Sequence, residues 1–303
     1  MKKLSLLLCL LVLLLTCCSS EVSFEYTYDT FYTTTESGVK AGNKEALLPK
    51  TCSSKICLSL VASDNVNEVV EIPSELKIKY SMNCEIVVIG AGAFVDLDFD
   101  SRKKLVEVIL PESVKMIDAY AFAGRINLSK INLDNVLIIK EGAFSNYIFF
   151  TESDFKNDET SKLWYGPYAI EGHKIKNLDL SSAIVIEDYA FASGIEYENI
   201  IFGDKLEYIG DYAFFDGSYY KELYLPKSLK YIGTEALGLK KSSSIRYAGT
   251  IEEFKNIQKG ENWYRSCTDR PMYPYFDIEI KCIDGTIKAS ELKFVAYYKA
   301  NLC

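Results

Sequence analysis

The sequence is poor in the residues that most often carry catalysis or bind metals. Its 303 residues include one histidine, His173, and no serine-nucleophile motif accompanies it. No C-x-x-C pair, H-E-x-x-H motif or calcium loop occurs either. We therefore expect no catalytic residue, no metal site and no cofactor. A hydrolase with a site in the long insertion or the C-terminal region, which would have to use His173, is the least favoured alternative.

Positive charge is also scarce. Lys and Arg number 34 against 42 Asp and Glu, which gives a formal net charge of −8. Nucleic acids bind to basic surfaces and anionic lipids attract polybasic segments, so neither is an expected partner. After residue 15 no apolar run reaches transmembrane length. With 49% apolar residues and only 7 prolines, the remainder has a globular composition.

The first residues have the pattern of an export signal. Met1-Lys2-Lys3 precedes an apolar run over residues 4–15 and then a Thr-Cys-Cys sequence. A basic start before a short apolar core is typical of a secretory signal, and the run is too short to span a bilayer. The end of this stretch resembles a bacterial lipobox, which implies lipidation of Cys17 or Cys18. Plain secretion is the alternative.

The dominant feature of the chain is a repeated corner motif, in which Ile is followed four residues later by Ala and then by a large apolar residue. Copies lie at residues 89–94, 117–122, 139–144, 186–191, 209–214 and 232–237, at steps of 28, 22, 47, 23 and 23 residues. A period near 23 predicts the coil of a solenoid, because so short a unit cannot bury its own apolar face. The long step approximates two coils. We interpret Tyr168-Ala169-Ile170 within it as a degraded copy, with a separate loop as the alternative.

Each predicted coil has two apolar stretches. The first follows the pattern L-x-x-L-x-L, as in Leu105, Val108 and Leu110, and these positions should point inward. The second, such as residues 228–232, is a short strand along the opposite wall. The corner Ala is small where coils approach closely, and the corner phenylalanines should stack along the axis. These residues are Phe94, Phe122, Phe144, Phe191 and Phe214.

One stretch, Leu223-Tyr-Leu-Pro-Lys-Ser-Leu-Lys-Tyr-Ile-Gly-Thr-Glu-Ala236, resembles the repeats of the BspA-like leucine-rich-repeat surface antigens. The resemblance covers residues 66–288 and implies a β-rich solenoid, a right-handed coil stack with a small α/β C-terminal cap. It also implies adhesion to host or bacterial partners. The spacing of Ile251, Phe254 and Ile257 predicts an amphipathic helix that plugs the open end of the stack.

The chain is therefore divided into four parts. These are a signal peptide or lipobox at 1–18, a flexible tether at 19–48, the solenoid at 49–247 and the cap at 248–303. The tether is polar and rich in Thr. Its alternating aromatic residues, from Tyr26 to Tyr32, are also compatible with an added edge strand.

Six cysteines remain beyond the export signal. They are Cys52, Cys57, Cys84, Cys267, Cys282 and Cys303. An even number in an exported chain suits disulfides, with Cys52–Cys57 and Cys267–Cys282 as the pairs close in sequence. Free buried thiols are the alternative.

The outward positions of the first strands form a candidate binding face, because exposed Ile109, Ile201 and Tyr224 on such a face indicate contacts with a partner. The candidate residues are Val106, Glu107, Ile109, Lys130, Asn132, Lys176, Asn177, Asp179, Glu198, Ile201, Lys221, Glu222 and Tyr224. The rival site is the insertion after residue 145. Its aromatic residues are Phe149, Phe150, Trp164 and Tyr165.

These observations predict an exported, non-enzymatic protein that binds an extracellular protein or glycan. It would lie on the cell surface or outer envelope, contacting the membrane only through an N-terminal lipid anchor, or it would be secreted. A structural or assembly component of the cell envelope without a host ligand is the alternative.

Overall fold

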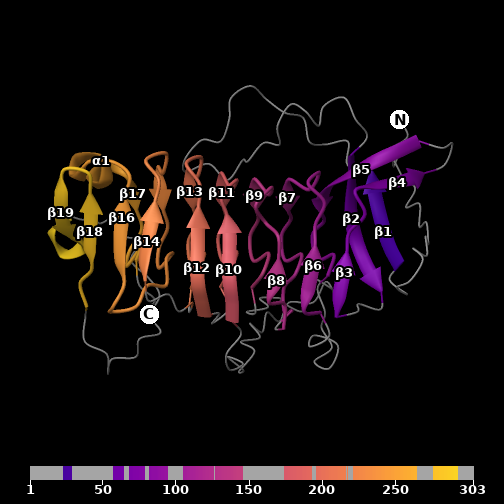
Figure 1. Cartoon of the computed structure of the whole chain (residues 1–303), viewed down its shortest axis with the longest axis horizontal. Helices are drawn as coiled ribbons and strands as arrows, with labels where there is room; N and C mark the ends of the chain where they lie inside the picture. Colours follow the sequence, from indigo (N-terminus) through magenta and orange to yellow (C-terminus); the bar gives the residue numbers. More distant parts are fainter. Residues whose placement is uncertain are drawn as a thin grey trace, which may run out of the picture.

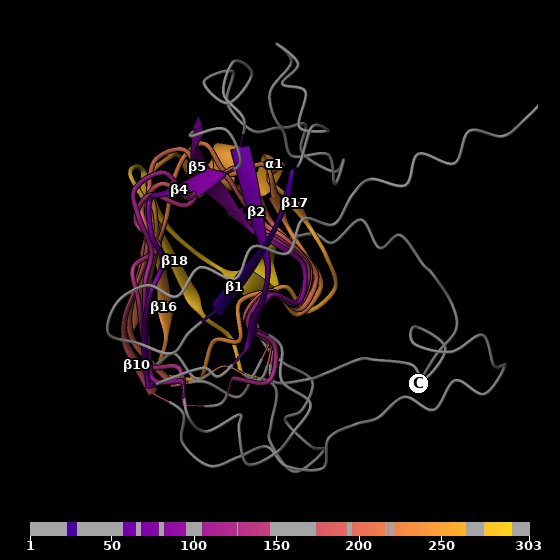
Figure 2. The ribbon, with the colours of Figure 1, turned by 90° about the vertical axis from the view of Figure 1, so that its right-hand side faces the viewer.

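The computed structural model describes residues 23–28, 57–64, 68–78, 82–94, 105–125, 127–145, 174–192, 196–215, 217, 221–264 and 276–292. Within these residues the chain winds as a solenoid whose coils lie side by side along one axis (Figure 1). Seen along that axis, each coil has a front wall and a back wall of β-structure (Figure 2). The predicted β-rich solenoid is confirmed.

The front wall faces the viewer in Figure 1. Its strands are β3 (Val69–Glu71), β6 (Glu107–Ile109), β8 (Lys130–Ile131), β10 (Lys174–Leu180), β12 (Glu196–Phe202), β14 (Glu222–Leu225), β16 (Ser244–Tyr247), β18 (Glu279–Cys282) and β19 (Gly285–Lys288). They form sheets in the orders β3-β6-β8, β10-β12 and β14-β16-β18-β19. Neighbours pair in parallel, except that β18 and β19 form an antiparallel hairpin.

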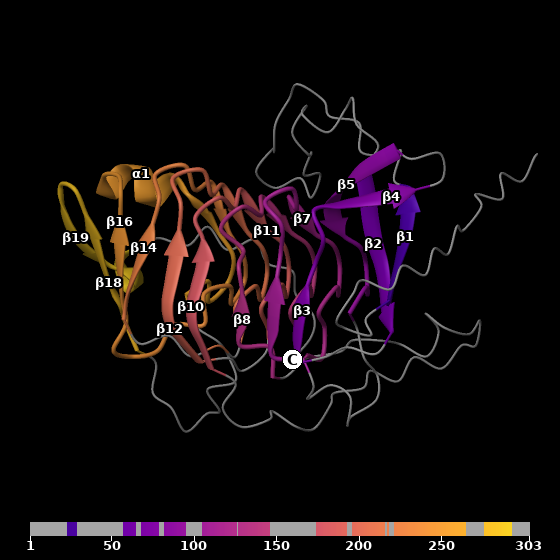
Figure 3. The ribbon, with the colours of Figure 1, turned by 45° about the vertical axis from the view of Figure 1, so that its right-hand side comes forward.

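The back wall is one sheet running the length of the stack (Figure 3). Its strands are β1 (Ser23–Tyr28), β2 (Cys57–Asp64), β4 (Glu75–Ile78), β5 (Met82–Ile89), β7 (Met116–Ile117), β9 (Ile138–Ile139), β11 (Val185–Ile186), β13 (Tyr208–Ile209), β15 (Tyr231–Ile232) and β17 (Gln258–Lys259). The order is β1-β2-β5-β7-β9-β11-β13-β15-β17, with β4 paired to β5. In this wall each strand from β7 onward is two residues long, so neighbouring coils pair only briefly here.

The corner phenylalanines form a continuous ladder through the core. Successive rings of Phe94, Phe122, Phe144, Phe191 and Phe214 stack nearly parallel, with centroids 4.9, 5.2, 5.0 and 5.2 Å apart. The N–H of each ladder residue donates to the corner carbonyl of the next coil, as from Phe94 to Ala121 at 2.7 Å. The corner alanines are buried, so their small size permits this approach of backbones. The predicted ladder is confirmed.

The ladder corrects our interpretation of the 47-residue step. Phe144 stacks directly on Phe191, and β9 pairs in parallel with β11 through Ile138 with Val185 and Ile139 with Ile186. No coil therefore lies between them, and Tyr168-Ala169-Ile170 is not a rung of the ladder. The step comprises one coil and an inserted segment, residues 146–173, which lies outside the described residues.

The residue before each corner Ala adopts a left-handed backbone, which the sequence reading did not anticipate. The φ angles are 66° at Gly92, 56° at Tyr120, 61° at Gly142, 57° at Tyr189, 57° at Tyr212 and 47° at Glu235. Glycine suits this conformation, whereas a bulky side chain is strained in it. The repeated geometry aligns tyrosines of successive coils, and the rings of Tyr189 and Tyr212 stack at 4.9 Å.

Ionisation of Tyr189 makes the free energy of unfolding depend on pH in the alkaline range. Burial and the neighbouring Tyr212 and Asp188 raise the pKa of Tyr189 from 10.0 to about 12. A raised pKa in the folded state stabilises the protein below pH 10, and this contribution disappears as pH rises through about 12. We expect urea unfolding to show a falling free energy over this range, and Tyr189→Phe to weaken the fall while altering stability little near neutral pH. Identical pH dependence in both proteins would contradict this account.

At the N-terminal end, part of the predicted tether is a strand. β1 pairs antiparallel with β2, with Ser23 opposite Asp64 and Tyr28 opposite Leu58. The alternation of aromatic residues therefore marks an added edge strand at 23–28, and the tether assignment is wrong for those residues. The rest of the predicted tether, and the signal region with Cys17 and Cys18, lie outside the described residues.

At the C-terminal end, the solenoid continues beyond the predicted boundary at residue 247. β17 pairs in parallel with β15, and the N–H of Leu237 donates to the Trp263 carbonyl at 3.1 Å. Trp263 thus occupies the place of a corner Ala, and Tyr264 that of a ladder residue. Trp263 is fully buried, with its ring edge-on to Phe254 at 5.8 Å. Large rings can replace the small corner residue here because the ladder ends at this coil.

The predicted helix is present as α1 (Ile251–Asn256), with Phe254 buried and Ile257 at its C-cap. It lies in the turn between β16 and β17, at the edge of the terminal coils, rather than across the end of the stack (Figure 1). A 3₁₀ turn, Ala289–Glu291, follows the β18–β19 hairpin. Among the described residues no helix has the length and apolar composition needed to cross a bilayer.

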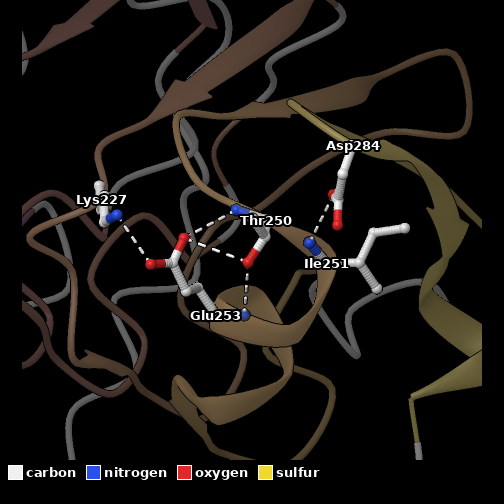
Figure 4. Close-up of polar contacts among 5 residues, drawn as sticks. All are labelled: Lys227, Thr250, Ile251, Glu253 and Asp284. Atoms are coloured by element: carbon white, nitrogen blue, oxygen red, sulfur yellow. Dashed lines mark hydrogen bonds and ion pairs between the residues drawn. The ribbon is translucent and has the colours of Figure 1, made fainter.

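A capping box begins α1 (Figure 4). The Thr250 Oγ1 accepts from the Glu253 N–H at 3.2 Å, and the Glu253 carboxylate accepts from the Thr250 N–H at 2.9 Å. Lys227 pairs with the same carboxylate at 2.7 Å, and Asp284 accepts from the Ile251 N–H at 2.8 Å. The cap therefore ties the helix to the preceding coil and to the β18–β19 hairpin.

Removing the Thr250 hydroxyl tests how much this cap stabilises the C-terminal coils. Thr250→Ala leaves a first-turn N–H without its side-chain acceptor, which should lower the unfolding free energy by about 1 kcal/mol. The exposed Thr286 in β19 provides the control, since Thr286→Ala removes a hydroxyl that takes no part in the capping box. Equal losses for the two variants in denaturant unfolding would count against the cap.

Candidate interaction face

The front face is the solvent side of the front wall, and the structure brings the predicted residues together on it. Ile109, Ile201 and Tyr224 are 41%, 46% and 36% exposed, as expected for outward positions. Val69, on β3, is 48% exposed on the same face and was missed because Asn67 takes the place of the first apolar residue in the L-x-x-L-x-L pattern of its coil. Their grouping on one face makes this face the candidate contact surface.

The strand registers place these residues in two groups. Val69 and Ile109 lie on the neighbouring strands β3 and β6, and we call them the N-terminal patch. Ile201 and Tyr224 lie on β12 and β14, and we call them the C-terminal patch. The back-wall order β7-β9-β11-β13 places Ile109 and Ile201 three coils apart, or about 14 Å at the usual strand spacing.

Polar side chains around the C-terminal patch hold one another in place. The Asn199 side-chain amide donates to Asn177 at 2.8 Å and accepts from Lys221 at 3.2 Å. The Tyr224 hydroxyl donates to Asp204 at 3.1 Å, which helps fix the orientation of its ring. These exposed groups are therefore preorganised, which reduces the entropy lost on binding.

Glu222 is the centre of a charged cluster that extends onto the C-terminal coils. Its two carboxylate oxygens accept from Arg246 at 2.7 Å and from Lys281 at 2.8 Å. The hydrogen bonds from these cations lower the pKa of Glu222, so the group is ionised at neutral pH. Lys281 was missed because its strand had been assigned to the cap, and Arg246 was missed because we assigned no outward positions beyond Tyr224, although both residues continue the outward positions of the front wall.

One predicted face residue, Asn132, also has a structural role. The Asn132 side chain accepts from the Leu110 N–H at 2.7 Å and donates to the Leu110 carbonyl at 2.9 Å. These bonds connect two coils, so much of the amide is occupied by the backbone. On the same face Lys130 pairs with Glu107 at 3.3 Å, while Lys176 is exposed. Val106, Asp179 and Glu198 are partly buried.

Several other predicted sites cannot be compared with the structure. The insertion residues Phe149, Phe150, Trp164 and Tyr165 lie outside the described residues, as do His173, Cys52, Cys267 and Cys303, and the side chains of Cys57 and Cys84. Cys282 is described, and its thiol is free rather than in a disulfide. Burial and nearby Asp284 raise the pKa of this thiol, so it is less reactive than an exposed cysteine. The described residues contain no cluster of His, Cys, Asp or Glu suited to a metal ion.

The coils, the ladder and the outward strand positions define a leucine-rich-repeat solenoid. The BspA type leucine rich repeat region matches the chain as six copies, over residues 79–185 and 165–268. These stretches together cover well over half of the sequence, and the chain belongs to the BspA-type leucine-rich-repeat family.

The solved structures described next share little sequence with this chain. Similar solved structures include the T. pallidum leucine-rich-repeat protein, with 17% identity and a TM-score of 0.31 over 68% of this chain and 74% of that one. The pneumococcal vaccine antigen PcpA has 16% identity and a TM-score of 0.37 over 64% and 44%. A leucine-rich cell surface protein of Faecalibacterium prausnitzii has 15% and 0.28 over 67% and 68%. No curated protein sequence matches, and we base no functional conclusion on these structures.

Proposed function

We propose that this protein is exported and binds an extracellular protein or glycan through the front face, without catalysing a reaction. The observation that carries this proposal is the row of exposed apolar residues on that face, in the N-terminal and C-terminal patches. Burying them against a partner would be favourable, and the ladder behind them holds the wall in one shape. A preformed wall of this kind loses little entropy on binding.

The first residues of the chain support the proposed location. The basic start, the apolar run and the pair Cys17-Cys18 support export with lipidation, and diacylation would hold the solenoid at the cell surface. Mass spectrometry of the mature N-terminus tests this directly. An acylated Cys17 or Cys18 is the expected result, and an unmodified N-terminus downstream of both would support secretion instead.

The face is tested by replacing its apolar residues. A triple variant with Ile109→Ser, Ile201→Ser and Tyr224→Ser should bind extracellular-matrix proteins or intact cells about tenfold or more weakly. Ile283, which is 72% exposed in the turn between β18 and β19, supplies the control through Ile283→Ser. Undiminished binding by a folded triple variant would remove the front face from consideration.

A further inference from the structure

The C-terminal patch lies beside two cations, whereas the N-terminal patch is flanked by carboxylates. In the strand registers Glu107 and Glu71 lie opposite the two residues of the N-terminal patch. Arg246 lies opposite Tyr224, and Lys281 lies opposite Arg246. Asp179 lies opposite Ile201 and Asp204 accepts from the Tyr224 hydroxyl, so the C-terminal patch also has carboxylates beside it. The two cations on its C-terminal side are what distinguish it from the N-terminal patch.

The two cations are fixed but remain accessible. Both bind the single carboxylate of Glu222, at 2.7 Å and 2.8 Å, through different oxygens. The side chains of Arg246 and Lys281 are nevertheless 63% and 47% exposed. Two cations share one carboxylate, so this cluster keeps a net positive charge. Arg and Tyr side by side are also the residue types that most often dominate protein interfaces.

We propose that the partner is a protein, which places an apolar side chain over Ile201 and Tyr224 and a carboxylate against Arg246 and Lys281. This inference rests on the proposed function of the front face and names the class of its ligand. The carboxylate would bind the guanidinium of Arg246, whose side chain is 63% exposed. Electrostatic attraction would speed the encounter, and the apolar contact would supply most of the affinity.

The apolar residues favour a protein over a glycan. Sugars pack their C–H faces on flat aromatic rings and are held by dense hydrogen bonds. Three of the four residues in the patches are branched aliphatic side chains, Val69, Ile109 and Ile201, which are suited to other apolar side chains. The separation of the two patches, about 14 Å, also fits within a standard protein interface.

The experiment uses short linear peptides displayed on phage, selected against the immobilised full chain. We expect enrichment of sequences in which an apolar residue lies close to Asp or Glu. Arg246→Ala with Lys281→Ala should reduce binding of the selected peptides about tenfold or more, and so should Ile201→Ser with Tyr224→Ser. Binding should also weaken between about 50 mM and about 500 mM salt.

The matched control is Ile283→Ser, which removes an exposed apolar side chain outside both patches and leaves the cations and the C-terminal patch intact. Thermal melting of every variant shows which ones are folded. Selected peptides without acidic residues, peptides that bind the Arg246 and Lys281 variant normally, or no enrichment at all would overturn the proposal.

A glycan array probed with the same variants distinguishes failure of the inferred protein partner from failure of the proposed front face. Glycan binding that is lost in Tyr224→Ser would overturn the protein partner while supporting the front face. If selected peptides bind but are insensitive to every front-face variant, the proposed function fails together with this inference.

Discussion

Replacing Phe191 with alanine is expected to lower the unfolding free energy by about 3–5 kcal/mol, because a buried ring is lost and a cavity remains. Phe191 is fully buried and stacks on two neighbours, with centroids 5.0 Å from Phe144 and 5.2 Å from Phe214. It also follows the insertion, so it is the rung that joins the two halves of the ladder. Neither neighbour can fill the space, since each is held by its own coil.

Denaturant unfolding measures this loss, and Phe215 provides a control in the next coil. Its ring lies off the ladder, edge-on to Tyr212 at 5.4 Å, and is only partly buried. Phe215→Ala removes the same atoms and should cost clearly less. Equal losses for the two variants would mean that the ladder does not carry the core.

The sequence predicted the coil correctly because the positions that define a coil lie close together in the chain. The L-x-x-L-x-L positions and the corner motif repeat within about 23 residues, so alternation alone identifies the inward side chains and the rings that stack. The 47-residue step could not be interpreted in the same way. Whether it holds one coil or two depends on β9 pairing with β11, a contact between distant residues that no local pattern shows.

The outward side chains of the candidate face could be predicted in the same way. Ile109, Ile201 and Tyr224 are exposed as predicted, because strand alternation fixes which side chains point outward. Arg246 could have been found by extending the outward positions one strand beyond Tyr224, since β16 pairs with β14 in the same register. The bonds of Asn132 to the backbone of another coil could not be predicted, because they depend on coil packing rather than on sequence pattern.

Close packing between coils makes Gly203 the second position at which a substitution should strongly lower stability. Gly203 follows β12 and lies next to Ser181, which follows the paired strand β10. A Cβ at Gly203 would lie 1.7 Å from the Ser181 carbonyl oxygen and 2.7 Å from its carbonyl carbon. The clash is with backbone, which cannot rotate away as a side chain would, so two paired coils must separate.

Gly203→Ala should therefore lower the unfolding free energy by about 3 kcal/mol, at the upper end of the usual cost of overpacking. Sequence comparison between coils would not predict this, because Ser181 and Pro226 carry side chains at the corresponding positions. Ser181→Ala is the matched control: it changes an exposed side chain on the other side of the same contact and should alter stability little. Denaturant unfolding of both variants decides the matter. If Gly203→Ala is as stable as Ser181→Ala, the coils do not approach as closely as the register of β10 and β12 requires.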